Sequence, residues 1–206
     1  TNTLPVAVTG IGSAAFNSGT LWLGGVQQPA GLRLAGGTLR LLPSFQGGSI
    51  TNLALQGMDL AGSNRVSGVL VLNNSGVSGD LVIDPPGRLD LDGSGAKTFG
   101  NIRLLNSGTV RWLAGSVDFD SSGGSSRLSN AGLWEIHVDS GLRYSYAGAQ
   151  PRFVNTGVLR KLNGSGTTSF ASLGFVQEGT MDIQKGRLDV VNCSGTLSGT
   201  TGLDRK

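Results

Sequence analysis

The chain has 206 residues, of which 35 are glycine, 14% are charged and 38% are hydrophobic. Glycine at this frequency with only 6 prolines is typical of strands joined by tight turns, and it excludes a disordered linker or a collagen-like segment. The formal net charge of +3 comes from 16 basic and 13 acidic residues. These basic residues show no stripe with interleaved aromatics along the sequence, so no nucleic-acid partner is expected.

Read from the N-terminus, the chain repeats an Asn-x-Gly turn followed by a short apolar run. The turns begin at Asn17, Asn74, Asn106, Asn130 and Asn155, and Gln177 begins a degenerate sixth. The last four are spaced by 24, 25 and 22 residues. A nearly fixed period of this size predicts a solenoid in which each repeat is one coil stacked on the next.

The first part of the chain, residues 16–98, repeats the motif loosely. Its candidate strands are 20–23, 39–42, 69–72 and 81–83. The turns at Asn74 and Asn106 are 32 residues apart, which we interpret as an insertion. Pro85-Pro86-Gly87 marks this insertion, because proline cannot donate a hydrogen bond to an inner ladder.

The second part, residues 99–197, repeats regularly, and aligning it on the turns predicts vertical columns of side chains. Side chains of a strand alternate between two faces. One face carries the predicted core residues Val110, Trp134, Leu159 and Met181, with Trp112, Ile136 and Ile183 beside them. Lys161 interrupts this set, so either its ammonium reaches the end of the coil or the register shifts and Leu162 points inward.

The opposite face predicts a ladder of charges. It reads Arg111, Glu135, Arg160 and Asp182 down the stack. Because successive coils lie about 4.8 Å apart, we expect each of these charges to face an opposite one above and below. Exposed pairs of this kind contribute only about 0–1 kcal/mol each, so they set the register more than the stability.

Further columns flank the turns and fill a second strand. Leu104, Leu128, Phe153 and Phe175 are expected to point inward. The turn residues Asn106, Asn130 and Asn155 are expected to stack as an amide ladder inside the bend. A second strand is expected in 87–92, 115–120 and 186–190, with Asp90, Asp118 and Asp189 outside and the alternating apolar residues, Val190 among them, inside.

These patterns predict an all-β fold, a right-handed parallel β-helix (solenoid) with roughly 20–25 residues per coil, as one domain over residues 1–206. The handedness follows from the strong preference of parallel crossovers for the right-handed form. No amphipathic helix that would cap an end is evident. We therefore expect a segment of a longer chain, capped by flanking domains.

The combination of Asn-x-Gly-Thr-Leu/Val, Gly-x-Leu-Asp-Val and Phe-x-Asn-x-Gly resembles the β-strand repeats of large secreted bacterial surface proteins. These are the right-handed β-helical passengers of autotransporter-like adhesins. The resemblance covers 99–197 closely and 16–98 loosely. It implies an extracellular or cell-surface location and a non-enzymatic structural or adhesive role, with a cell-surface or matrix glycan or protein as the partner.

Polysaccharide-cleaving enzymes with β-helical folds are the alternative, because they gather carboxylates and basic groups on one outer sheet. The candidate catalytic residues are Glu135, His137 and Asp139, flanked by Arg111 and Arg160 on neighbouring coils. A carboxylate beside an imidazole is suited to proton transfer. The competing interpretation is an exposed ion-pair ladder with one histidine at its edge.

Candidate binding residues are few. Exposed aromatic rings can stack on sugars, and Trp22, Tyr144 and Tyr146 are the candidates. The acidic loop that contains Asp90 and Asp92 is similar to a calcium loop but lacks a closing acidic residue, so no metal and no cofactor is expected. The single cysteine excludes a disulfide within the chain, and no apolar run is long enough for membrane insertion.

Overall fold

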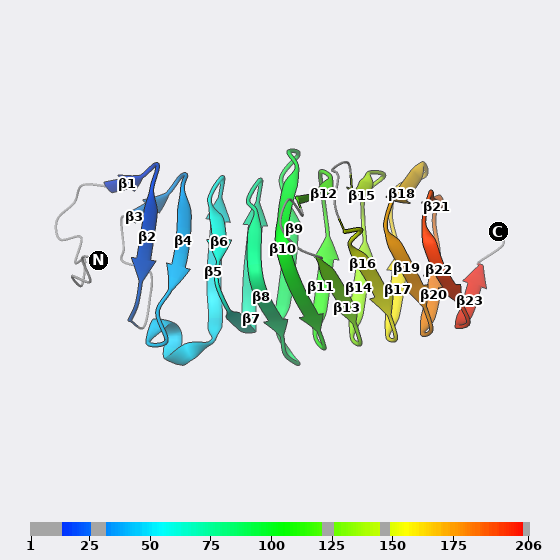
Figure 1. Ribbon diagram of the computed structural model, residues 1–206, viewed down its shortest axis with the longest axis horizontal. Helices are drawn as coiled ribbons and strands as arrows, with labels where there is room; N and C mark the ends of the chain where they lie inside the picture. The colour runs from blue at the N-terminus through cyan, green and yellow to red at the C-terminus, as the bar shows by residue number, and fades with distance from the viewer. Residues whose placement is uncertain (1–13, 26–31, 121–125, 145–148, 204–206) are drawn as a thin grey trace.

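The computed structural model describes residues 14–25, 32–120, 126–144 and 149–203. Over these residues the chain is an all-β parallel solenoid of about 8 turns with about 21 residues per coil. Figure 1 shows successive coils following one another along the long axis, from the blue strands β2 and β4 to the red strands β21 and β23. The fold class expected from the turn period is therefore confirmed.

Each coil of the regular part contributes one strand to each of three parallel stacks. Stack 1 contains β5 (Ile50–Gln56), β7 (Asn64–Asn73), β9 (Arg88–Asp92), β11 (Thr109–Trp112), β14 (Leu133–Ile136), β17 (Val158–Lys161), β20 (Thr180–Ile183) and β23 (Thr200–Leu203). Stack 2 contains β2 (Thr20–Leu23), β4 (Thr38–Leu41), β6 (Asp59–Ala61), β8 (Val77–Ile83), β10 (Lys97–Asn106), β12 (Val117–Asp120), β15 (Gly141–Tyr144), β18 (Thr167–Ala171) and β21 (Arg187–Val191).

Stack 3 begins with the first residues of β7 and continues with the second halves of β8 and β10, because these long strands bend across a corner. It then contains β13 (Arg127–Asn130), β16 (Arg152–Asn155), β19 (Gly174–Gln177) and β22 (Ser194–Leu197). A separate parallel pair is formed by β1 (Ala14–Phe16) and β3 (Leu32–Leu34), and one short 3-10 helix, η1 (Phe45–Gly48), precedes β5.

The core lies between the three stacks and consists of the predicted columns. Val110, Trp134, Leu159 and Met181 are paired in register in stack 1, and the first three are fully buried. In stack 3 the register joins Leu104, Leu128, Phe153 and Phe175. The rings of Phe153 and Phe175 stack with centroids 5.8 Å apart. Both inward columns are therefore confirmed.

An amide ladder runs along the corner between stacks 3 and 1, as the turn motif predicts. Asn106 Nδ2 donates to Asn130 Oδ1 at 2.6 Å, Asn130 Nδ2 donates to Asn155 Oδ1 at 2.6 Å, and Asn155 Nδ2 donates to Gln177 Oε1 at 3.0 Å. All four side chains are at most 1% exposed. The ladder thus satisfies polar groups that the bend would otherwise bury unpaired.

The glycine that closes each of these turns is required by the stacking of coils. Gly108, Gly132, Gly157 and Gly179 lie outside the left-handed region of backbone conformation. A Cβ atom on Gly132 would lie 2.2 Å from the Gly108 carbonyl oxygen of the preceding coil. The close approach of two backbones is therefore the physical reason for glycine at these positions.

The five Asn-x-Gly turns occupy two different corners, which the sequence alignment did not separate. Asn106 lies at the corner between stacks 3 and 1, where its partner in the preceding coil is Ile83. Asn74 lies at another corner, between β7 and β8, and Asn17 lies between β1 and β2. The inferred insertion is therefore wrong. Residues 84–87 occupy the corner that would otherwise hold an Asn-x-Gly turn, and Gly87 there accepts the backbone hydrogen bond of Thr109.

The predicted second strand is also corrected in two respects. Residues 88–92 form β9 of stack 1 and pair with β11, whereas 117–120 and 187–191 form β12 and β21 of stack 2. Alternation alone did not distinguish the stacks, since both carry the same in-and-out pattern. Val190 shares the inward register of the fully buried Phe170, as expected, but it is 42% exposed because β21 is the last strand of stack 2 in the described residues.

Two lysines lie inside the solenoid at its corners. Lys161 is fully buried between Ile136 and Ile183 in the register, and its Nζ donates to Asp139 Oδ1 at 2.6 Å and to Thr168 Oγ1 at 3.0 Å. The ammonium therefore reaches the coil end, which is the first of the two alternatives from the sequence. Lys97 is also fully buried and donates to the backbone carbonyls of residues 93, 95 and 114.

Candidate functional site

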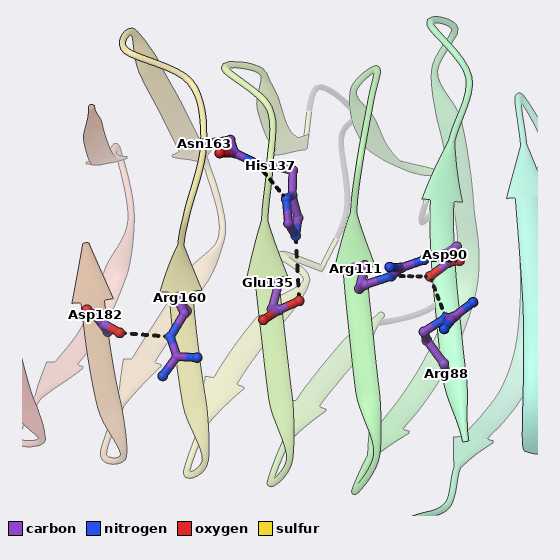
Figure 2. Close-up of polar contacts among 8 residues, drawn as sticks. All are labelled: Arg88, Asp90, Arg111, Glu135, His137, Arg160, Asn163 and Asp182. Carbon is purple, nitrogen blue, oxygen red and sulfur yellow. Dashed lines mark hydrogen bonds and ion pairs between the residues drawn. The ribbon is translucent and has the colours of Figure 1, made fainter. Parts of the chain in front are cut away.

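The outer side of stack 1 carries the charged residues that the sequence analysis singled out. Figure 2 shows them on consecutive strands as three separate groups. The register of Arg111, Glu135, Arg160 and Asp182 is as predicted, and Asp90, which was expected on a different strand, precedes Arg111 in the same column. The side-chain contacts along the column differ from the predicted ones. The expectation that each charge faces an opposite one both above and below is wrong, because each arginine side chain turns toward one neighbour only.

The first group is built around Asp90. Arg111 Nε and Nη2 donate to the two carboxylate oxygens at 2.8 and 2.6 Å, and Arg88 Nε lies 3.1 Å from Oδ1. The hydrogen bond to Asp90 raises the pKa of the Arg111 guanidinium above its usual value. Bidentate pairing of this kind fixes both side chains. The side-chain hydrogen bonds of Arg111 thus go to Asp90, while Glu135 in the next coil acts on the Arg111 pKa through its charge.

The second group contains Glu135, His137 and Asn163. His137 Nε2 lies 3.5 Å from Glu135 Oε2, and Asn163 Nδ2 lies 3.0 Å from His137 Nδ1 (Figure 2). Donation by Asn163 favours the imidazole tautomer with its hydrogen on Nε2, facing the carboxylate. The side chains of Glu135 and His137 are 17% and 21% exposed. An oriented imidazole beside a carboxylate can hold and transfer a proton.

Asp139 does not join this pair. Its Oδ1 accepts from the buried Lys161 ammonium at 2.6 Å and its Oδ2 accepts from the Gly166 backbone N–H at 2.8 Å. These hydrogen bonds, the one from Lys161 first, lower the pKa of the Asp139 carboxyl. Asp139 therefore neutralises a corner lysine. The sequence grouped it with Glu135 by the alternation of one strand, but β14 ends at Ile136, so the alternation does not extend to Asp139.

The third group joins Arg160 and Asp182, with Arg160 Nε donating to Asp182 Oδ2 at 2.8 Å (Figure 2). The calcium-like acidic residues are likewise engaged or isolated. Asp90 is 5% exposed and contacts two arginines, and Asp92 lies half-buried near Lys97, where burial lowers the pKa of the ammonium and the Asp92 charge offsets part of that lowering. No group of three or more His, Cys, Asp or Glu side chains with metal-binding geometry occurs among the described residues.

The two aromatic candidates that the structure describes differ in exposure. Trp22 is 43% exposed, and the Arg40 guanidinium carbon lies 5.5 Å from its ring centroid, a cation–π contact that covers one face. Tyr144 is only 8% exposed, so its ring is not available for surface stacking and this candidate is corrected. Its place in β15 puts it on the inward side of the alternation. Tyr146 lies outside the described residues.

Two partners in these groups were missed by sequence reasoning. Arg88 lies two residues before Asp90 and therefore on the same face of the strand, and this spacing is the sequence signal for the contact. Asn163 lies 26 residues from His137, beyond the end of its strand, and nothing local in the sequence pointed to it. The tautomer of the histidine therefore depends on a tertiary contact.

These observations define the class: the chain is a repeat protein with a parallel β-solenoid fold and laterally paired charges on one outer sheet. Comparison with protein-family models, curated proteins and solved structures finds no match for this chain. Within the described part of the chain, no helix has the length and apolar character needed to cross a membrane.

Proposed function

We propose that this solenoid is a non-enzymatic structural and adhesive segment, extracellular or at a cell surface, that presents an elongated face for attachment to a glycan or a protein. The observation that supports the proposal most directly is the outer side of stack 1. Its charged side chains are engaged in separate lateral groups. A rigid row of repeated groups is suited to extended or multivalent contact.

The resemblance of the repeats to the β-helical passengers of autotransporter-like adhesins supports the same role. In such an arrangement the described coils serve as a stalk or binding surface between flanking domains of the same chain. Open solenoid ends expose unpaired strand edges, so flanking segments that cover them fit the proposal.

A carbohydrate-active enzyme is the second candidate, and one observation favours it. Glu135 and His137 form an oriented pair with a nitrogen–oxygen distance of 3.5 Å, while Arg111 and Arg160 stand on the coils on either side. Against this, Asp139 is committed to Lys161, so a second carboxylate for glycoside hydrolysis is lacking in this group.

A glycan array together with reducing-end assays on neutral and acidic polysaccharides separates the two functions. The adhesive proposal expects binding without release of new reducing ends. As a matched pair, Glu135→Gln removes the carboxylate of the His137 group and Asp118→Asn removes one that pairs with Arg143 on another stack. Release of reducing ends that is lost only in Glu135→Gln would establish the enzyme instead, and absence of both binding and cleavage would contradict attachment to glycans.

A further inference from the structure

The outer side of stack 3 carries a column of arginines that the linear sequence does not show. Arg103 pairs in register with Arg127, and Arg127 pairs with Arg152. All three side chains are exposed. They lie 24 and 25 residues apart in the chain, so only the stacking of coils brings them together, with strands about 4.8 Å apart. The linear sequence shows no basic stripe, whereas the stacking of coils forms a column of three arginines on this face.

This column lacks the compensation seen on stack 1. Arg103 Nε donates to Asp80 Oδ1 at 2.9 Å, while Arg127 Nε donates to the neutral Ser129 Oγ at 3.0 Å. Among the described residues, no carboxylate forms an ion pair with Arg127 or Arg152. Like charges on directly neighbouring strands are destabilising. Two adjacent uncompensated guanidiniums therefore oppose folding and are available to a ligand of opposite charge.

A hollow lies at the end of the column toward the N-terminal coils. It has a volume of about 300 Å³ and is lined by Arg65, Asp80, Val82, Arg103 and Leu105, among others. Beside the arginines runs a second outward row that reads Val82, Leu105, Ser129 and Val154, of which Leu105 is 43% exposed. The arginine column thus continues from a recess, and the row along one side of it is apolar except at Ser129.

The chemistry of the column selects its ligand. Guanidinium groups present rigid donor forks that match carboxylate and sulfate oxygens. Their repeat along the solenoid axis is the strand spacing, which is close to the length of one sugar unit in an extended polysaccharide. Single-stranded nucleic acids need aromatic platforms for their bases, and the outward positions of β8, β10, β13 and β16 in this stack hold no aromatic residue.

We propose that the arginine column Arg103–Arg127–Arg152 binds a linear acidic polysaccharide that lies along the solenoid axis. The inference rests on the proposed attachment function and names its ligand class and its face. Bound carboxylate or sulfate groups replace the missing counter-charges of Arg127 and Arg152. The affinity accordingly depends on salt, because binding releases the counterions of the polyanion.

The test measures binding of the full chain to heparin and to polygalacturonate, with dextran as the neutral probe and oligo(dT) as the nucleic-acid probe. The double variant Arg127→Gln/Arg152→Gln removes the two uncompensated charges. The matched control Arg33→Gln/Lys185→Gln removes two exposed charges that lie outside the column. Circular dichroism verifies the fold of both, and each titration is repeated at two salt concentrations.

The proposal expects the column variant to lose about tenfold or more in affinity for the acidic polysaccharides with a shallower salt dependence, while the control changes less than about twofold. Equal losses in both variants, or none in the column variant, overturn it. Binding to oligo(dT) as tight as to heparin overturns it in favour of nucleic acid. Binding of neutral glycans alone would leave the attachment function standing and remove this inference.

Discussion

Removing one amide from the middle of the corner ladder is the most direct test of how the coils are held in register. Asn130 accepts a hydrogen bond from Asn106 and donates to Asn155 Oδ1 at 2.6 Å and to the Val158 carbonyl at 3.0 Å. Asn130→Ala deletes all three interactions without adding bulk. Because the side chain is 1% exposed, water does not readily replace the lost partners.

The expected cost follows from these contacts. Each hydrogen bond contributes about 1 kcal/mol net, and a buried acceptor left unpaired costs about 1–3 kcal/mol more. Asn106 Nδ2 retains the Leu133 carbonyl at 3.0 Å as a partner, whereas Asn155 Oδ1 loses its donor. We therefore expect Asn130→Ala to lower the free energy of unfolding by about 4–6 kcal/mol.

Urea denaturation followed by circular dichroism measures this change, and Asn17→Ala is the matched control. Asn17 begins the same kind of Asn-x-Gly turn but is exposed and lies at another corner, so its replacement is expected to cost less than about 1 kcal/mol. A loss in Asn130→Ala that is no larger than that of the control would refute the ladder as a source of stability.

Three other measurements test the glycine corner and the two buried lysines. Gly132→Ala, whose Cβ would clash with the preceding coil, is expected to destabilise by about 2–3 kcal/mol or more, whereas Gly100→Ala, with its nearest atom at 3.7 Å, should be tolerated in the same urea assay. The pKa of the Asp139 carboxyl is lowered in the folded state, so its contribution to stability is present above pH 3.8 and is lost as the pH falls through the folded-state pKa. Thermal melts at pH 5 and pH 3 should show this loss of stability in the wild type. The loss should be smaller in Lys161→Met. Burial lowers the pKa of Lys97 to about 8 from 10.5, so the unfolded chain holds that proton more tightly than the folded chain. The free energy of unfolding should therefore rise by roughly 1–2 kcal/mol between pH 8 and 10.5. An equal rise in Lys97→Met would contradict this assignment.

In the candidate site, the alternation of charge along a column predicts where each charged residue lies better than it predicts which partner its side chain contacts. The register of Arg111, Glu135 and Arg160 follows from the same period that places the core residues. The direction in which each arginine turns does not follow from it. Exposed ion pairs differ by only about 0–1 kcal/mol, so small local differences decide whether a guanidinium reaches the coil above or the coil below.

The arginine column illustrates a signal that was present in the sequence but required the third stack to be recognised. Arg103, Arg127 and Arg152 each precede a residue of the confirmed inward column that contains Leu104, Leu128 and Phe153. Alternation therefore places all three on the outer side. The three arginines are not adjacent in the sequence, because their proximity arises through the coil period.

By itself the sequence determined the coil period, the parallel stacking, the inward columns and the amide ladder. These features depend on residue spacing and on strand alternation, both of which are local and repeated. Only the tertiary structure decided which corner each Asn-x-Gly turn occupies, because the same tripeptide fits either bend. It also decided the burial of Tyr144 and the partners of Lys161 and His137, since Asp139 lies 22 residues from Lys161 and Asn163 lies 26 residues from His137 in the chain.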